Sequence, residues 1–167
     1  MKKNHQQGAG LLEVLVALLL LAVSVLGFAA MQLRAVEAAS EGSYRVQGIN
    51  LARDLAERMR SNRLGADTYR SQIQTPANQS ESTKNCYTNF CTAVELADFD
   101  VSEIRKDADR AGMTFNLMDC RGAAAKTRQC IYVAWSQTSA TDGTDTTACT
   151  NGNAYQTNSQ CVILEAF

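Results

Sequence analysis

Glu13 lies near the start of a long apolar segment, where an ionised carboxylate is energetically unfavourable. It is the only formally charged residue between Lys3 and Arg34, and the apolar segment around it continues to about Met31. Residues 11–31 are long enough to cross a bilayer as one helix. An ionised carboxylate at the centre of a membrane helix costs roughly 2.5–3.5 kcal/mol on insertion scales. Glu13 is therefore a candidate functional residue, for which we expect a positively charged partner.

The second group of reactive residues is a set of six cysteines that all follow the apolar segment. They are Cys86, Cys91, Cys120, Cys130, Cys149 and Cys161. An even number of cysteines on the translocated side of a membrane is typical of disulfides in an oxidising compartment. Sequence alone leaves the pairing open. We favour sequential pairing, Cys86–Cys91, Cys120–Cys130 and Cys149–Cys161, which closes short loops worth about 2–3 kcal/mol each.

Residues suited to catalysis or metal binding are scarce. The chain has no C-x-x-C pair, and its only histidine, His5, precedes the apolar segment. It also lacks the nucleophile elbow, the P-loop, the H-E-x-x-H motif and the dinucleotide fingerprint. The run Asp142-Gly143-Thr144-Asp145 is rich in oxygen ligands but lacks EF-hand spacing, which favours an ordinary polar turn. We predict no catalytic residue, no cofactor and no metal, with calcium in residues 142–151 left open.

The charge balance does not favour nucleic acid as a direct ligand. The formal net charge is −1 for 167 residues, whereas nucleic-acid-binding domains usually carry a basic patch. One cluster of basic residues does occur, at Arg53, Arg58, Arg60 and Arg63. Asp54 and Glu57 interleave with it, so we interpret this segment as a solvated, salt-bridged helix face.

A short basic segment, which contains Lys2 and Lys3, precedes the apolar run. The positive-inside rule predicts a cytoplasmic N-terminus and a translocated C-terminal part. One interpretation is a plain membrane anchor. Another is a secretory signal peptide with an apolar region at 14–26 and a small-residue cleavage site at 27–29. The third is a leader peptide that is cut before the apolar helix.

Residues 8–31 resemble the signal of type IV prepilins. In that family a short basic leader ends in Gly, a dedicated peptidase cuts after this Gly on the cytoplasmic side, and Glu stands at the fifth mature position. Here Gly8 ends the leader, Ala9 would be the first mature residue, and Glu13 falls at the fifth position. Residues 12–18 further resemble PilV-type minor pilins. The mature chain would begin with Ala, where most family members have Phe or Met.

The resemblance assigns roles to Ala9 and Glu13. Prepilin peptidase would cleave between Gly8 and Ala9, and Ala9 would be the site of N-methylation. Cleavage frees an α-amine with a pKa near 8, which is positively charged at neutral pH. In a filament the amine of one subunit would pair with Glu13 of a neighbour. Each charge is costly alone in an apolar environment, so the pair would set the axial register between subunits.

The resemblance also implies a location and partners. The protein would first span the inner membrane once, with a cytoplasmic N-terminus and a periplasmic head, and would then enter the extracellular pilus. Its partners would be prepilin peptidase, other minor pilins, the major pilin and the inner-membrane assembly platform. Minor pilins prime assembly, at the tip, and support pilus display, twitching, adhesion or DNA uptake. The implied role is structural and not enzymatic.

Three alternatives stay open at this point. The first is a type II secretion pseudopilin, which is built alike but forms a short periplasmic filament. The second is a secreted binding module, released by signal peptidase near Ala29. The third is a membrane-tethered enzyme, although the sequence contains no recognisable catalytic set.

The apolar helix is expected to continue past the membrane. Residues 32–63 are rich in helix-forming residues and contain no proline. Apolar residues recur there at three- and four-residue spacing and predict one buried stripe. The stripe comprises Val46, Ile49, Ala52, Leu55 and Met59. Gly27, Gly42 and Gly48 are the positions where this helix, from about Leu11 to Arg63, would bend most easily.

The remaining residues predict a small α+β head. Residues 64–92 are polar and read as a long loop. A helix is expected at 94–111, capped by Asp98 or Asp100 and ended by Gly112. Strands are expected at 113–117, 130–135 and 160–167, and a Thr-rich loop at 136–158. Tyr132 and Trp135 are expected to be core residues.

We therefore predict an α+β, type IV pilin-like fold. A long N-terminal helix, with a membrane half and an amphipathic half, packs on a small antiparallel sheet with disulfide-bonded loops. The predicted domains are a leader at 1–8, the transmembrane and assembly half of the helix at 9–31, its amphipathic half at 32–63, and the globular head at 64–167.

Overall fold

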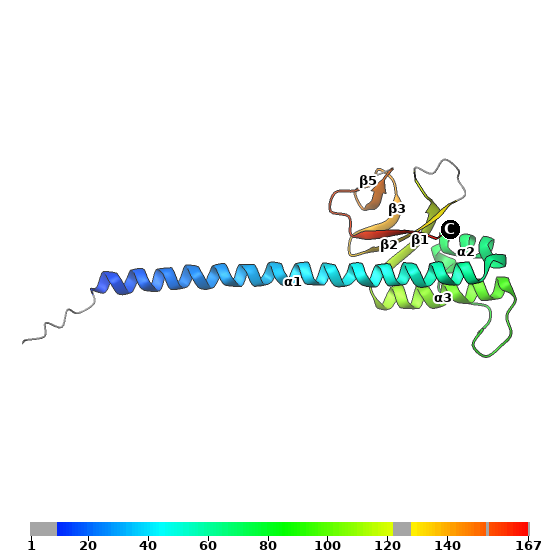
Figure 1. Ribbon diagram of the computed structural model, residues 1–167, viewed down its shortest axis with the longest axis horizontal. Coiled ribbons are helices and arrows are strands. Elements are labelled where there is room, and N and C mark those ends of the chain that lie inside the picture. Colours follow the sequence, from blue (N-terminus) through cyan, green and yellow to red (C-terminus); the bar gives the residue numbers. More distant parts are fainter. Residues whose placement is uncertain (1–9, 122–127, 153, 167) are drawn as a thin grey trace, which may run out of the picture. The chain divides into compact units, whose positions relative to one another are not determined.

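The structure is a computed structural model that describes residues 10–121, 128–152 and 154–166 (Figure 1). The chain divides between Gly42 and Ser43 into two compact units, and we describe each by itself. One helix, α1 (Leu11–Ser61), contributes to both. It passes through Gly27, Gly42 and Gly48 without a break.

The first unit consists of the part of α1 up to Gly42. The helix begins after Gly10, whose carbonyl accepts a hydrogen bond from the backbone N–H of Glu13 at 2.8 Å. None of its described residues is buried. Among the described helices, α1 is the one long and apolar enough to cross a membrane.

In the second unit, which we call the head, α1 packs through one face. Its buried residues are Gly48, Ala52, Leu55, Ala56 and Met59. Val46 is exposed, so its place in the predicted stripe is wrong, whereas Leu55 and Met59 lie in the core as expected. Gly48 is buried instead and faces the sheet: a Cβ at position 48 would lie 3.2 Å from side-chain atoms of both Trp135 and Val162. A glycine therefore lets the helix approach the strands closely.

Residues 64–92 are not one loop. They contain a 3₁₀ turn, η1 (Arg63–Gly65), the helix α2 (Ala66–Gln74) and a second 3₁₀ turn, η2 (Pro76–Asn78). The buried residues of α2 are Tyr69 and Ile73. Their four-residue spacing is the signature of a helix face, but the polar residues around them obscured it.

The helix α3 (Ala93–Arg110) begins one residue earlier than predicted and has a different cap. Thr92 accepts a hydrogen bond from the backbone N–H of Glu95, and the Glu95 side chain accepts one from the backbone N–H of Thr92. This reciprocal pair is a capping box. Asp98 and Asp100, the predicted caps, lie inside the helix and are buried.

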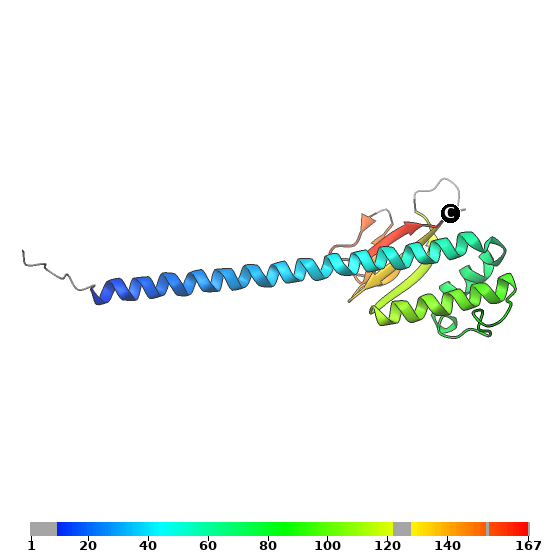
Figure 2. The same ribbon diagram turned by 60° about the horizontal axis from the view of Figure 1, so that its bottom comes forward.

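Strands β1 (Met113–Asp119), β2 (Gln129–Trp135) and β6 (Cys161–Glu165) form an antiparallel sheet in the order β1-β2-β6. Met113 pairs with Trp135 across β1 and β2, and Cys130 pairs with Glu165 across β2 and β6. These are the three strands that the sequence predicted. Residues of α1, α2 and α3 share one core cluster with one face of this sheet (Figure 2).

The predicted loop at 136–158 instead carries a second sheet. It is formed, within the described residues, by β3 (Ser139–Asp142), β4 (Ala148–Asn151) and β5 (Ala154–Tyr155). β3 and β4 are parallel, which departs from the expected single antiparallel sheet. Ala140 and Cys149 join Tyr132 in a second core cluster on the other face of β2. Short Thr-rich strands escape prediction because polar residues are also typical of turns.

Three disulfides link the described cysteines, in the sequential pairing that the sequence favoured. Cys86–Cys91 closes a loop before α3. Cys120–Cys130 joins the residue after β1 to β2, and Cys149–Cys161 joins β4 to β6. The last bond therefore ties the second sheet to the first. The α+β fold class that the sequence predicted, with a long apolar N-terminal helix and disulfide-bonded loops, is confirmed.

Candidate functional site

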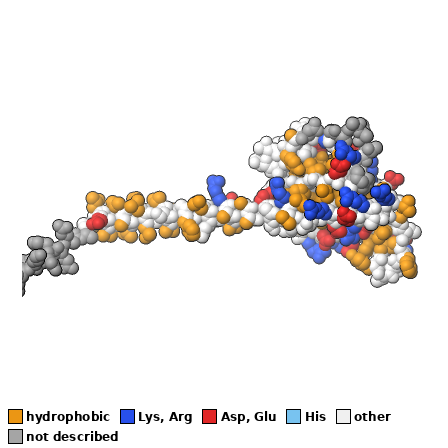
Figure 3. All heavy atoms as spheres, in the orientation of Figure 1, with side chains coloured by type: hydrophobic (Ala, Val, Ile, Leu, Met, Phe, Trp, Pro, Cys, Tyr) orange, Lys and Arg blue, Asp and Glu red, His pale blue; other side chains and the backbone are white. Residues whose placement is uncertain are grey.

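The apolar surface of the first unit is its most distinctive feature. Large hydrophobic side chains are exposed along this part of α1, from 50% for Val14 and Val16 to 80% for Leu11. Figure 3 shows them along its visible face. Isolated exposed apolar residues are normal, but a continuous apolar surface marks a contact with membrane or protein. This segment therefore needs a covering of lipid or of other helices.

Glu13 lies in the first turn of α1, at the start of this apolar surface. The N-terminus of a helix carries a partial positive charge, which favours a carboxylate there. That local effect is worth about 0.3–1 kcal/mol, which is less than the cost of placing the charge in lipid. Gly8 and Ala9, the predicted cleavage and methylation positions, lie outside the described residues. The pairing of Glu13 with a neighbour's amine stays a prediction.

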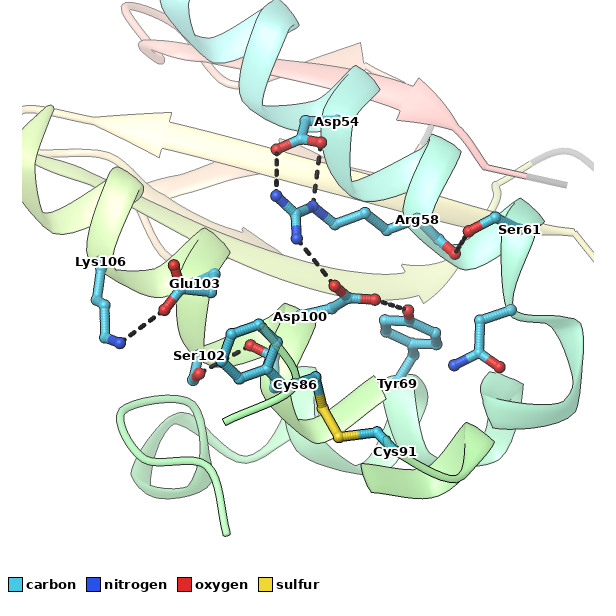
Figure 4. Close-up of polar contacts among 12 residues, drawn as sticks. Asp54, Arg58, Ser61, Tyr69, Cys86, Cys91, Asp100, Ser102, Glu103 and Lys106 are labelled. Atoms are coloured by element: carbon cyan, nitrogen blue, oxygen red, sulfur yellow. Dashed lines mark hydrogen bonds and ion pairs between the residues drawn. A yellow bond between two sulfur atoms is a disulfide. The ribbon is translucent and has the colours of Figure 1, made fainter. Parts of the chain in front are cut away.

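A polar network inside the head joins α1 to α3 (Figure 4). The Arg58 guanidinium donates from Nε to Asp54 Oδ1 at 3.1 Å and from Nη1 to Asp100 Oδ1 at 2.8 Å. The Tyr69 hydroxyl donates to the other oxygen of Asp100. Asp100 thus binds residues from both α1 and α2. Asp100 lies inside α3, which Thr92 caps, and its carboxylate serves this network instead.

The network also shifts the ionisation of its members. Burial by itself would lower the pKa of Arg58, but the hydrogen bonds and charges of Asp54 and Asp100 outweigh it and raise that pKa. Burial and the hydrogen bond to Asp100 raise the pKa of Tyr69. Arg58 therefore stays charged and Tyr69 stays neutral at neutral pH. Neither Arg58 nor Tyr69 is therefore poised to exchange a proton near pH 7, which favours a structural role for the network.

A second set of contacts attaches the loop that contains Cys86 to α3. The backbone N–H of Thr83 donates to Asp98 Oδ2 at 2.9 Å. Lys84 forms an ion pair with Glu95 at 3.3 Å. The hydrogen bonds from the Thr92 backbone and side chain, and then the contact with Lys84, lower the pKa of Glu95. The loop is therefore fixed to the first turns of α3 from both sides of the disulfide.

The Asp142 carboxylate, the strongest calcium candidate, is occupied by donors of the protein itself. Its Oδ1 accepts hydrogen bonds from the Thr150 hydroxyl and the Gly152 N–H, both at 2.8 Å, and Arg121 binds its other oxygen. Burial alone would raise the pKa of Asp142, but these donors hold it below its usual value. The described residues contain no group of three or more ligands suited to a metal ion. These contacts support a structural role for Asp142 within the second sheet.

A groove of about 370 Å³ lies beside the Cys120–Cys130 disulfide. Tyr132, Arg128 and Glu165 are among its lining residues. Arg128 already pairs with Glu165 at 3.1 Å. Burial raises the pKa of Tyr132, so its hydroxyl stays protonated at neutral pH. Its described lining residues include no activated nucleophile and no paired acid and base.

The comparisons with known proteins agree with this architecture. A family model described as "Tt1218-like: Type IV pilin Tt1218" matches residues 30–102, from the apolar part of α1 into α3. Neither a curated protein nor a solved structure matches the chain significantly. The matched region excludes Gly8 and Glu13, so the prepilin-like motif and the family match are separate observations. The fold is pilin-like, and over the matched region the chain is similar to type IV pilins.

Proposed function

We propose that this protein is a minor pilin of a type IV pilus, of the PilV type. Prepilin peptidase cleaves it after Gly8, it spans the inner membrane once, and it then joins the filament. Its partners are the major pilin, other minor pilins and the inner-membrane assembly platform. In the pilus it primes assembly at the tip and so supports pilus display, twitching, adhesion or DNA uptake.

One observation carries the proposal. The first unit of α1 exposes apolar side chains all along its length and holds Glu13 in its first turn. A helix of this kind has two suitable environments, a bilayer and a bundle of similar helices. A pilin occupies first one and then the other. Glu13 gains a partner in the bundle when the α-amine of a neighbouring subunit lies beside it.

The proposed processing gives the first test. The N-terminal residue and the intact mass of the protein from its native membrane fraction are measured. An N-terminus at Ala9, with or without an added methyl group, is the expected result. A start near Ala30 would identify a secreted domain released by signal peptidase, and the pilin proposal would be abandoned.

Substitution of Glu13 tests assembly itself. Glu13→Ala is expected to lower the amount of the protein in sheared filaments by about tenfold or more, while cleavage after Gly8 continues. Glu37→Ala is the matched control, because it removes a carboxylate from the same helix beyond the predicted membrane half. Normal incorporation of Glu13→Ala would contradict the proposed role of this carboxylate.

A further inference from the structure

The three disulfides of the head differ in how well the protein shields them from an attacking thiol. Two of them include at least one buried cysteine, namely Cys149–Cys161 and Cys120–Cys130. In the third, Cys86 and Cys91 are both partly exposed, and residues 87–90 between them are exposed (Figure 4). A thiolate has to reach a sulfur atom before it can cleave a disulfide, so access helps to set which bond opens first. Of the three bonds, Cys86–Cys91 is the one most accessible to thiol exchange.

The residues on both sides of this disulfide are attached to α3 independently of it. Lys84, before the loop, forms an ion pair with the Glu95 carboxylate at 3.3 Å. The backbone N–H of Thr92, after the loop, donates to the same carboxylate at 2.8 Å. Glu95 therefore holds both ends of the loop to the first turn of α3. When the sulfur–sulfur bond opens, Cys86 and Cys91 stay near each other, which favours closing it again.

The surroundings of the two sulfur atoms suit the products of opening. Cys91 directly precedes Thr92, the N-cap of α3. The N-terminus of a helix carries a partial positive charge, which stabilises a thiolate released there. Cys86 Sγ lies 3.8 Å from the carbonyl oxygen of Glu95, which can accept the weak hydrogen bond of a thiol. These contacts favour a thiolate at Cys91 and a thiol at Cys86.

We propose that Cys86–Cys91 is a thiol-exchange site, which a dithiol opens while the other two disulfides stay closed and the head stays folded. A thiolate of the dithiol attacks the sulfur of Cys86 and forms a mixed disulfide, and Cys91 leaves as a thiolate that takes up a proton. The second thiol of the reductant then attacks the reductant's own sulfur in the mixed disulfide and releases Cys86. The dithiol loses two electrons and two protons and becomes a disulfide, and the protein gains two thiols.

This inference goes beyond the proposed function, because it depends only on the disulfides and on the contacts of the loop with α3. The four residues between the two cysteines are already exposed, so opening the bond uncovers no part of the core. The loop alone gains freedom, since local opening of an exposed segment does not require the core to unfold. The site is thus a reversible redox switch of one loop.

The test uses the full chain in mild detergent with dithiothreitol as the dithiol. Free thiols are trapped with excess N-ethylmaleimide after increasing times and are mapped by mass spectrometry. The fluorescence of Trp135, in β2, reports whether the head remains folded. The expected result is that Cys86 and Cys91 are labelled about tenfold faster than either of the other pairs. Trp135 fluorescence should be unchanged when this first pair is fully labelled.

A substitution in α3 tests whether Glu95 holds the opened loop in place. After the first bond is reduced, dithiothreitol is removed and oxidised glutathione is added. Glu95→Ala is expected to slow the re-formation of Cys86–Cys91 by about threefold or more, because both ends of the loop are then released. Glu103→Ala is the matched control, since it removes another carboxylate of α3, one that pairs with Lys106 at 2.7 Å. The control should change the rate by less than about twofold.

Several results would overturn the inference. Equal labelling of all three pairs would show that thiols form only when the whole head unfolds. Earlier opening of Cys120–Cys130 would show that another bond is the exchange site. Loss of the folded Trp135 signal together with the first pair would make that bond a support of the entire head. An unchanged rate in Glu95→Ala would refute the holding role of this carboxylate. Absence of the chain from filaments would instead refute the proposed function and leave this inference standing.

Discussion

The two parts of α1 differ in what covers them. None of the described residues up to Gly42 is buried, whereas the part from Ser43 to Ser61 contains five buried residues. Both parts are rich in helix formers, so helix propensity alone does not distinguish them. The difference is tertiary, because the head covers its part of α1 and no described residue buries the part in the first unit. Helix formation and burial are therefore separate properties of the same element.

Reduction of the disulfides should have the largest effect, and only on the head. Each short disulfide-closed loop is worth about 2–3 kcal/mol, so a thiol reductant should lower the free energy of unfolding by several kcal/mol. Trp135, the only tryptophan, lies in β2 and reports head unfolding by fluorescence. If all six thiols react freely in the native protein, the disulfide assignment is wrong.

The next largest effect on head stability is expected from truncating a buried leucine of α1, and an exposed leucine of the same helix serves as the comparison. Leu55 is fully buried and Leu20 is 60% exposed. Leu55→Ala is expected to lower the free energy of unfolding of the head by about 2–5 kcal/mol because it leaves a cavity. Leu20→Ala should change it by less than about 0.5 kcal/mol. Denaturant unfolding of the full chain in mild detergent, followed by Trp135 fluorescence, measures both. Equal losses would contradict the division of α1 into covered and uncovered parts.

A pair of glycines sharpens the same comparison. A Cβ at Gly48 would lie 3.2 Å from Trp135 and from Val162, whereas nothing lies within 4 Å of one at Gly27. Overpacking costs about 1–3 kcal/mol, and Ala gains about 1 kcal/mol over Gly in a helix. Gly48→Ala should therefore destabilise the head by up to about 2 kcal/mol, with the same fluorescence assay as the measurement. Gly27→Ala should leave head stability unchanged, and a stabilised Gly48→Ala would show that Trp135 adjusts freely.

The smallest effect is a dependence of head stability on alkaline pH. Burial raises the pKa of Tyr69 and of Tyr132 above the usual value near 10. Above about pH 10 the unfolded state loses these protons while the folded state still holds them. The free energy of unfolding is therefore at its full value below about pH 10 and falls as the pH rises above it. Unfolding measured from pH 8 to 11 should show this decline, and Tyr69→Phe and Tyr132→Phe should each flatten it. Unchanged slopes in both variants would assign the decline to other groups.

The sequence predicted the elements whose own pattern is strong. A long segment that is rich in helix formers and free of proline predicts α1, and alternating or β-branched residues predict β1, β2 and β6. The sequence did not predict α2 or the second sheet, because most residues of these elements are polar and polar segments were interpreted as loops. It also misassigned Asp100, because the pattern of a helix cap does not show that Arg58 and Tyr69 converge on that carboxylate.

The candidate site divides in the same way. Glu13 could be found from sequence alone, because one charge in an apolar segment is conspicuous without any tertiary contact. The exposure of Phe90 could not, because this residue would pass for a core residue until the fold shows that it is fully exposed.

The sequence by itself determined the composition of each helix face, the apolar segment with its single carboxylate, and the number of cysteines. Those features depend on neighbours in the chain and on the solvent, so local physics is sufficient. Tertiary structure alone decided which residues of α1 are buried, where Asp98, Asp100 and Asp142 find their donors, and which aromatic residues remain exposed. These outcomes depend on contacts between residues far apart in sequence, and no local pattern specifies them.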